Sequence, residues 1–186
     1  MTKTIKNTTA AKKSDSKTAL NWKLTKQHTI VLGCLLMLFS IALLLSFISF
    51  YMYGHEDQST LTKLGDRNEI VGNWLGKFGS FLADVMVFKG FGIASFLFVR
   101  LFFLTGLFLA LSLPVRKLKN IWFWDLFVLL IVSLVFSFFA TTLPELGGIV
   151  GYELNLFLQD YIGKTGTVLV LIFGIVIYLL SKIKVS

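Results

Sequence analysis

Four long apolar stretches dominate the chain, at residues 29–52, 90–113, 121–143 and 165–181. A helix of about 20 apolar residues crosses the roughly 30 Å of hydrocarbon in a bilayer. Runs such as Leu43-Leu44-Leu45 and Phe138-Phe139 keep both faces of a segment apolar, whereas the strands of a membrane barrel alternate. The pattern therefore predicts an all-α polytopic membrane protein with four transmembrane helices at these positions.

The segment 71–87, between the first two apolar stretches, divides into a polar, an aromatic and a small-residue face when wound as a helix. It predicts a short amphipathic outer helix whose aromatic face lies in the headgroup region. Small residues let another backbone approach closely, so we expect the third face to be a packing face. The polar face holds Asn73, Lys77, Ser80 and Asp84; the aromatic face holds Val71, Trp74, Leu75, Phe78, Phe81, Leu82 and Val85; the packing face holds Gly72, Gly76, Gly79 and Ala83.

A second outer segment repeats this plan more weakly. Apolar residues recur every three or four positions through 146–162, which predicts another amphipathic surface helix. Glycines lead from each outer segment into the next apolar stretch. They are Gly90 and Gly92 in the first case, and Gly163 and Gly166 in the second.

The composition agrees with a membrane protein. Hydrophobic residues make up 55% of the 186 residues and charged ones 15%, against about 25% charged in soluble domains. The single cysteine, Cys34, excludes an internal disulfide and a zinc finger.

The net charge of +8 is distributed unevenly along the chain. Residues 1–28, the connection 114–120 and the tail after residue 181 together carry twelve Lys and Arg and one acid, whereas 53–89 and 144–164 carry five basic and eight acidic residues. Cytoplasmic segments are enriched in Lys and Arg. We therefore expect a basic cytoplasmic arm at 1–28, a four-span membrane domain at 29–186, and both termini in the cytoplasm.

Two charged residues fall inside the predicted spans. An arginine at the centre of a span, such as Arg100, costs about 2.5 to 3.5 kcal/mol on insertion scales. Counted from span ends at 113 and 121, Arg100 lies about 20 Å deep and Asp125 about 6 Å. A direct pair within one subunit is therefore not expected. Asp125 is interpreted as a solvated interfacial carboxylate, and Arg100 as snorkelling, bonding to neighbouring helices or contacting another subunit.

Groups for catalysis or cofactor binding are not found. Gly163-Lys164-Thr165 resembles the end of a phosphate-binding loop, but Leu158 stands where the pattern needs glycine. The adjacent His55, Glu56 and Asp57 cannot converge on one metal ion from a regular element. We expect no catalytic, cofactor or metal site and no enzyme activity.

Two glycine-rich strings resemble a known family. Asn73-Trp74-Leu75-Gly76-Lys77-Phe78-Gly79-Ser80-Phe81-Leu82-Ala83-Asp84, followed by Gly90-Phe91-Gly92, is similar to the N-x-x-G-x-x-G-A-x-x-A-D pattern and glycine-phenylalanine start of the second helix in the amino-terminal membrane domain of FtsK/SpoIIIE DNA translocases. Residues 146–151 and 161–166 resemble the segment ahead of that family's fourth helix. Ser80 replaces the usual alanine, and Val99-Arg100 stands where the family often has proline.

This resemblance implies a membrane anchor and assembly domain in cell division and chromosome segregation, at the septum of the bacterial inner membrane. Its expected partners are the lipid bilayer, further copies of the chain as a homo-oligomer, and other division proteins. DNA and ATP would be bound only through the family's motor, which is absent from this chain. The alternative hypothesis is a small transporter or channel subunit that uses Arg100.

Overall fold

Helices form all the regular structure in residues 26–60, 71–140 and 143–183, which are the residues that the computed structural model describes. Four helices there are long and apolar enough to cross a membrane, which confirms the predicted all-α, four-span class. The expected arm lies almost wholly outside the described residues. The elements are α1 (Lys26–Thr60), α2 (Gly76–Ala83), the π-helix η2 (Asp84–Phe91), the 3₁₀-helix η3 (Gly92–Ser95), α3 (Phe96–Ala110), α4 (Arg116–Ser137) and α5 (Pro144–Ile183).

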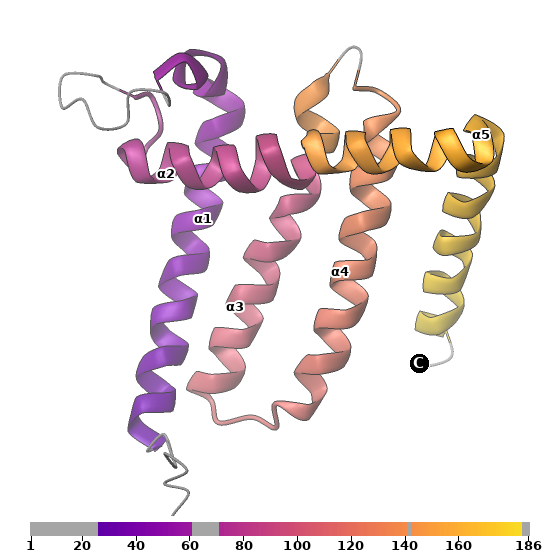
Figure 1. The fold of residues 1–186 in the computed structure, drawn as a ribbon. Helices are drawn as coiled ribbons and strands as arrows, with labels where there is room; N and C mark the ends of the chain where they lie inside the picture. Colours follow the sequence, from indigo (N-terminus) through magenta and orange to yellow (C-terminus); the bar gives the residue numbers. More distant parts are fainter. Residues whose placement is uncertain (1–25, 61–70, 141–142, 184–186) are drawn as a thin grey trace, which may run out of the picture.

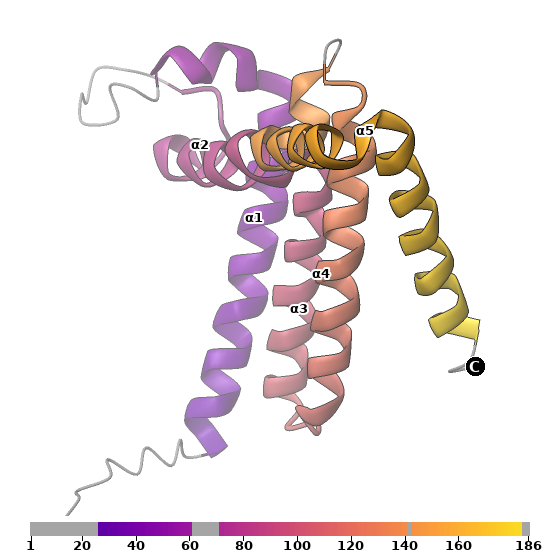
Figure 2. The same ribbon diagram turned by 45° about the vertical axis from the view of Figure 1, so that its right-hand side comes forward.

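The spanning helices form a row rather than a four-helix bundle. α1 packs against α3, α3 against α4, and α4 against the last part of α5. Between α1 and α5 the described contact is one hydrogen bond at the end of the row, from Tyr51 Oη to the carbonyl of Glu145. Figure 1 shows the four spans side by side, and Figure 2 shows the same row turned by 45°. The row is one helix thick, so both of its broad faces are open.

A second set of helices runs across one end of this row. It consists of α2, η2 and the part of α5 at 149–162, and we name it the transverse layer. In Figure 1 these pieces lie almost end to end over the spans, with α2 and η2 over α1 and α3. The start of α1, the end of α5 and the connection between α3 and α4 all lie on the side of the molecule away from this layer (Figures 1 and 2).

Glycines make the sharp turns between the transverse layer and the spans. Gly92 (φ 61°, ψ −136°) turns the chain into the second span, and Gly163 (φ 69°, ψ 168°) turns α5 into the fourth. Residues with a Cβ rarely adopt these angles. The predicted glycine-led start of each span therefore has a backbone cause at these two positions.

The helix boundaries differ from the expected spans at several places. The helix α1 continues to Thr60, although its candidate membrane span ends at Tyr53, close to the expected residue 52. The second span starts as α3 at Phe96, after the turns at Gly90 and Gly92. The third span starts at Arg116 rather than at residue 121, because the basic residues after Pro114 form the first turns of α4. The expected start at residue 121 came from the first apolar position after the charges, but the α4 backbone is already helical through the basic residues before it.

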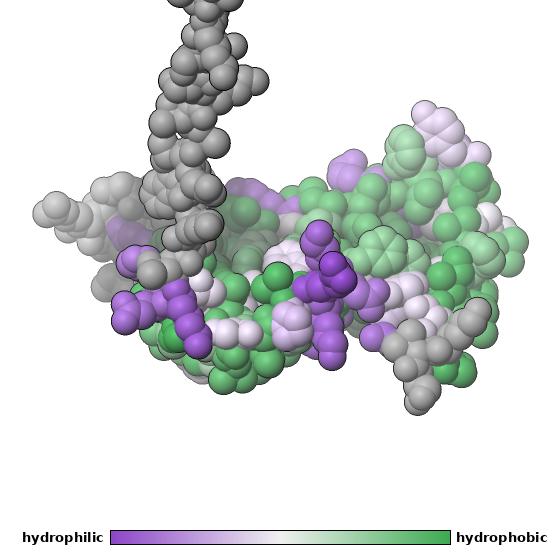
Figure 3. All heavy atoms as spheres, turned by 90° about the horizontal axis from the view of Figure 1, so that it is seen from below, coloured by the Kyte–Doolittle hydropathy of each residue, from purple (hydrophilic) through white to green (hydrophobic). Residues whose placement is uncertain are grey.

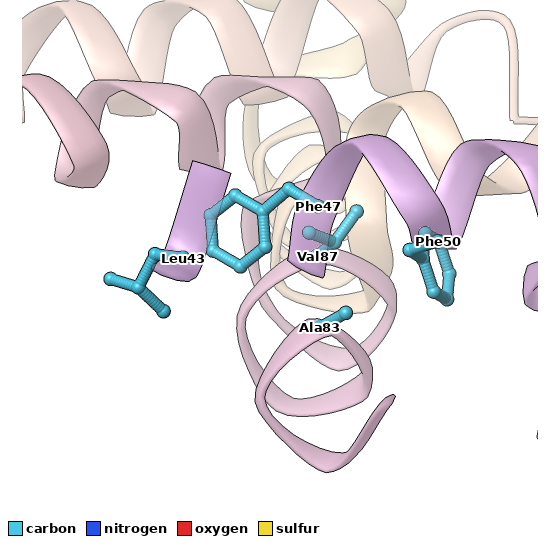
Figure 4. Packing of buried hydrophobic residues seen from close by; sticks show 5 residues of the cluster. All are labelled: Leu43, Phe47, Phe50, Ala83 and Val87. Atoms are coloured by element: carbon cyan, nitrogen blue, oxygen red, sulfur yellow. The ribbon is translucent and has the colours of Figure 1, made fainter. Parts of the chain in front are cut away.

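A small apolar core joins α1 to the transverse layer. Leu43, Phe47 and Phe50 of α1 are buried against Ala83 of α2 and Val87 of η2, as Figure 4 shows. The side chain of Phe47 packs edge-on against Phe96 of α3, with 5.6 Å between ring centroids. This cluster fixes the crossing of α2 over α1.

The opposite end of the molecule combines a polar centre with apolar flanks. Figure 3 views this end and shows one group of hydrophilic residues in the middle and another at the left, with hydrophobic side chains between and around them. The exposed Arg116, Lys117 and Lys119 begin α4 at this end. Cations at this level suit a membrane–water boundary.

Candidate functional site

Serine hydroxyls of α1 hold the start of the transverse layer. Ser46 Oγ donates to the carbonyl of Gly79 at 2.6 Å, and the backbone N–H of Trp74 donates to Ser49 Oγ at 3.0 Å. Asn73 Nδ2 donates to the Ser46 carbonyl at 3.0 Å. Ser46, Ser49 and Asn73 are buried, so water does not compete for these bonds, and they hold a backbone that crosses the spans instead of following them.

The polar face of the segment 71–87 points into the protein, and its aromatic face points away from it. Asn73, Ser80 and Asp84 are buried, whereas Trp74 and Phe78 are 53% and 64% exposed. Buried polar side chains and exposed aromatic ones suit a helix that lies at the membrane surface with its aromatic face toward lipid. The exposed aromatic face fits the expected position at the headgroup level.

Of the four residues of the expected packing face, two are buried within the chain and two are not. Gly79 and Ala83 are buried, with Ala83 packed on α1 of the same chain. Gly72 lies before α2 and is exposed. Gly76 starts the helix with φ 62°, and a Cβ there would meet no atom within 4 Å. The two halves of the face therefore have different surroundings.

The two halves of the transverse layer meet at a junction of glycine backbones. A Cβ on Gly148 (φ 68°, ψ 167°) would collide with the backbone of Gly90 and Gly92, and one on Gly92 would collide with the carbonyl of Leu146. Ser133 Oγ of α4 donates to the carbonyl of Gly147 at 2.7 Å, beside this contact. The glycine strings singled out in the sequence thus form one close backbone contact.

The π-helix η2 accommodates an ion pair. Lys89 Nζ lies 2.7 Å from Asp84 Oδ2, and the Asp84 side chain is 6% exposed. In an α-helix residues five apart point about 140° away from each other. The wider i to i+5 turn of a π-helix stacks them instead. The buried carboxylate thereby gains a cation from its own helix.

The structure corrects the prediction for Arg100 and Asp125, which form an ion pair and hydrogen bond between α3 and α4. Because α3 ends at Ala110 and α4 begins at Arg116, Arg100 is ten residues and Asp125 nine residues from the hairpin. Both then lie about 14 to 15 Å deep. Asp125 is also 5% exposed, so its interpretation as a solvated interfacial carboxylate was wrong. The expected span ends at 113 and 121 caused the error.

A groove beside this pair runs between α1 and α3. It measures about 350 Å³ and is lined by Ser40, Ile41, Leu44, Phe96, Val99, Arg100 and Phe103. The Arg100 side chain is 53% exposed although it sits at the middle of the span. Nearer the hairpin, Trp122 Nε1 donates to Thr105 Oγ1 at 3.0 Å, a second polar contact between α3 and α4.

The sequence interpretation missed the residues that join α1 to its neighbours. Gly33 and Gly106 face each other across α1 and α3, where a Cβ on either would lie 2.6 Å from the other's carbonyl oxygen. Single glycines inside apolar spans are the signal that could have found them. Ser46 and Ser49 were missed because isolated serines are common in membrane helices.

The arrangement supports helix packing rather than a reaction. The polar contacts described above join one helix to another or a side chain to a nearby backbone group. Among the described residues, no group of three or more His, Cys, Asp or Glu side chains could hold a metal ion.

We compared the chain with known protein families, curated proteins and solved structures. Neither the search of curated proteins nor the search of solved structures found a match. Residues 25–186 match the family model described as the 4TM region of DNA translocase FtsK/SpoIIIE. That region is a membrane domain and not the motor, and its match covers all four spans together with the transverse layer. The chain therefore belongs to the family of FtsK/SpoIIIE four-helix membrane domains.

Proposed function

We propose that this chain is the membrane anchor and assembly module of a DNA translocase that acts in cell division and chromosome segregation. The family match over residues 25–186 carries the proposal. The four spans and the transverse layer support it, because hydrogen bonds and a small apolar core join them into one membrane domain. The proposed site of action is the division septum of a bacterial inner membrane, where the chain would contact other division proteins.

The proposed orientation places both termini in the cytoplasm and the transverse layer at the outer surface. Its support is the charge bias between the two sets of connecting segments. In this orientation a motor that follows the fourth span would meet chromosomal DNA on the cytoplasmic side. DNA and ATP would be partners of that motor alone.

Assembly into a homo-oligomer is part of the proposal. Of the small-residue face, Gly79 and Ala83 already pack within the chain, so Gly76 is the position where added bulk best tests a contact with another copy. Because φ at Gly76 is 62°, any side chain there strains the backbone. Gly76→Ala is therefore the control for Gly76→Leu: both carry the strain, and only leucine adds bulk.

The transporter alternative loses its main motivation. It was motivated by Arg100 and by the broken outer helices, and Arg100 is paired with Asp125. An ion pair that joins two neighbouring helices is a sufficient structural role for both residues. The anchor proposal is therefore the one that we develop.

The test is a fluorescent fusion of residues 1–186, observed in dividing bacteria that carry a translocase of this family. We expect fluorescence at the division site, reduced by Gly76→Leu and retained by Gly76→Ala. An unrelated four-span membrane protein with the same fluorescent tag is the control for general membrane staining. Uniform fluorescence along the cell membrane, equal to that control, would contradict the septal part of the proposal.

A further inference from the structure

An apolar groove runs along the seam between α4 and the last part of α5. It measures about 210 Å³, and its lining includes Val128, Ile131 and Val132 of α4 and Ile175 and Tyr178 of α5. The lining side chains carry one polar atom, the tyrosine hydroxyl. The groove therefore fits a hydrocarbon chain and not a polar ligand.

Two lysines continue the walls of this groove toward the end of the molecule away from the transverse layer. Lys117 lies fourteen residues before Ile131, which is almost four turns, so both are on the same side of α4. Lys182 lies seven residues after Ile175, almost two turns, on the same side of α5. Lys182 Nζ is 5.6 Å from the centre of the Tyr178 ring, so its charge is held against a residue that lines the groove.

The two lysines lie at similar levels in the membrane. Trp124 of α4 and Tyr178 of α5 are level with each other, with 6.0 Å between their ring centroids. At 1.5 Å per residue, Lys182 is about 6 Å and Lys117 about 10 Å beyond this level, a difference that flexible lysine side chains can cover. Figure 2 shows the last part of α5 leaning away from α4 toward its end, so the seam widens on the side of the lysines.

Both lysines are available to an anion. Their side chains are exposed, and no carboxylate of the described residues forms an ion pair with either of them. Ile175 and Lys182 are about 10 Å apart along the helix, less than the roughly 15 Å of hydrocarbon in one leaflet. A molecule that lies along the seam would therefore meet two cations near the membrane surface and an apolar groove near the membrane centre.

We propose that this seam binds one anionic phospholipid from the leaflet on the side of both termini. An acyl chain lies in the groove, and the phosphate lies between Lys117 and Lys182. Basic pockets between membrane helices bind anionic headgroups in this way. The inference goes beyond the anchoring function proposed above and does not depend on a translocase role.

Charge complementarity selects this occupant. A second copy of the chain would bring further lysines to the same level, where like charges repel. A zwitterionic lipid brings a cation together with its phosphate, so it gains less from the two lysines. An anionic phospholipid supplies net negative charge and an apolar chain in the order in which the seam presents their partners.

The test measures quenching of Trp124 fluorescence by lipids that are brominated on the acyl chain. Trp124 contacts Tyr178 at the groove, so a bound acyl chain reaches its ring. The purified chain carries Trp22→Phe, Trp74→Phe and Trp122→Phe and is placed in phosphatidylcholine vesicles. These contain a small fraction of brominated phosphatidylglycerol or the same fraction of brominated phosphatidylcholine.

We expect phosphatidylglycerol to occupy the site at least about fivefold more tightly than phosphatidylcholine, the effect of one lysine near an anionic lipid. The chain with all its tryptophans should show the same preference in native mass spectrometry, by retaining phosphatidylglycerol on release from detergent. This second measurement does not depend on the tryptophan replacements.

Three variants locate the site. Lys117→Ala/Lys182→Ala should bring the quenching by the two lipids close to equality. The matched control Arg116→Ala/Lys119→Ala removes the same charge at the same end of the molecule, from other sides of α4, and should keep the preference. Val128→Phe narrows the groove with all charges in place and should reduce quenching by phosphatidylglycerol.

Equal quenching by the two lipids before any lysine is replaced would overturn the proposal. So would an equal loss of preference in the control variant, because the lipid would then be attracted by the basic end as a whole. A preference that Val128→Phe leaves unchanged would overturn the groove as the place of the acyl chain. The anchoring function is tested separately, by localisation in cells, so its failure and the failure of the lipid site are distinguishable.

Discussion

Gly148 and Gly163 allow two contributions of glycine to stability to be separated: its freedom to adopt a positive φ, and the close packing that the missing Cβ permits. Both have φ near 68° and ψ near 167°, but a Cβ at Gly148 would collide with the backbone of Gly90, whereas one at Gly163 would meet nothing within 4 Å. Strain in this region costs on the order of 1 to 3 kcal/mol. We expect Gly163→Ala to lose about that much unfolding free energy and Gly148→Ala to lose more, as measured by SDS titration of the protein in mixed micelles.

The difference between the two losses of unfolding free energy measures the contribution of close packing at Gly148, because the backbone strain is common to both variants. Equal losses would mean that the two halves of the transverse layer can separate at little cost. The family's glycine strings would then be explained by turn geometry alone.

At the scale of the helix, the sequence predicted which segments exist more reliably than where they end. Periodicity identified the amphipathic segments at 71–87 and 146–162. The structure has α2 with η2 at 76–91, so the first helix begins later than expected, and it has the 149–162 part of α5 in place of the second segment. Periodicity could not show the π-helix, since a wider turn leaves no mark on apolar spacing. It also could not show that α4 begins at Arg116, because basic residues suit both a loop and a helix at the membrane surface.

The α1–α3 contact gives a prediction at this scale. Gly33→Leu would push the two backbones apart where they approach most closely, against Ala110 and Gly106. Overpacking typically costs about 1 to 3 kcal/mol. We expect a loss of at least that size in the unfolding free energy in detergent.

The neighbouring Cys34 is the matched control for this variant. It is exposed on the same helix, so Cys34→Leu places the same leucine side chain outside the contact and should change the unfolding free energy by less than about 0.5 kcal/mol. If both variants were equally stable, the close approach of α1 and α3 would not hold the row together.

For the molecule as a whole, the sequence predicted four spans but not their arrangement. Apolar residues on every side of a span are compatible with a bundle or with a row, since lipid and protein interiors are both apolar. The Arg100–Asp125 pair was missed for a related reason: an error of a few residues at each end of the hairpin changed the estimated difference in depth from near zero to about 14 Å. Contacts between spans depend on such small offsets, which hydropathy does not specify.

The orientation of the whole molecule is the last prediction, and it follows from charge. Twelve basic residues and one acid lie in the segments on the side of both termini, so we expect Asn120, in the first turns of α4, to face the cytoplasm and Asp160, in the transverse layer, to face outward. Both side chains are exposed, and each can be replaced by cysteine in a Cys34→Ser background. A membrane-impermeant maleimide should label Asp160→Cys in intact spheroplasts, and Asn120→Cys only after the membrane is opened. The reverse pattern would put the transverse layer in the cytoplasm, and a motor attached after the fourth span could then not reach chromosomal DNA.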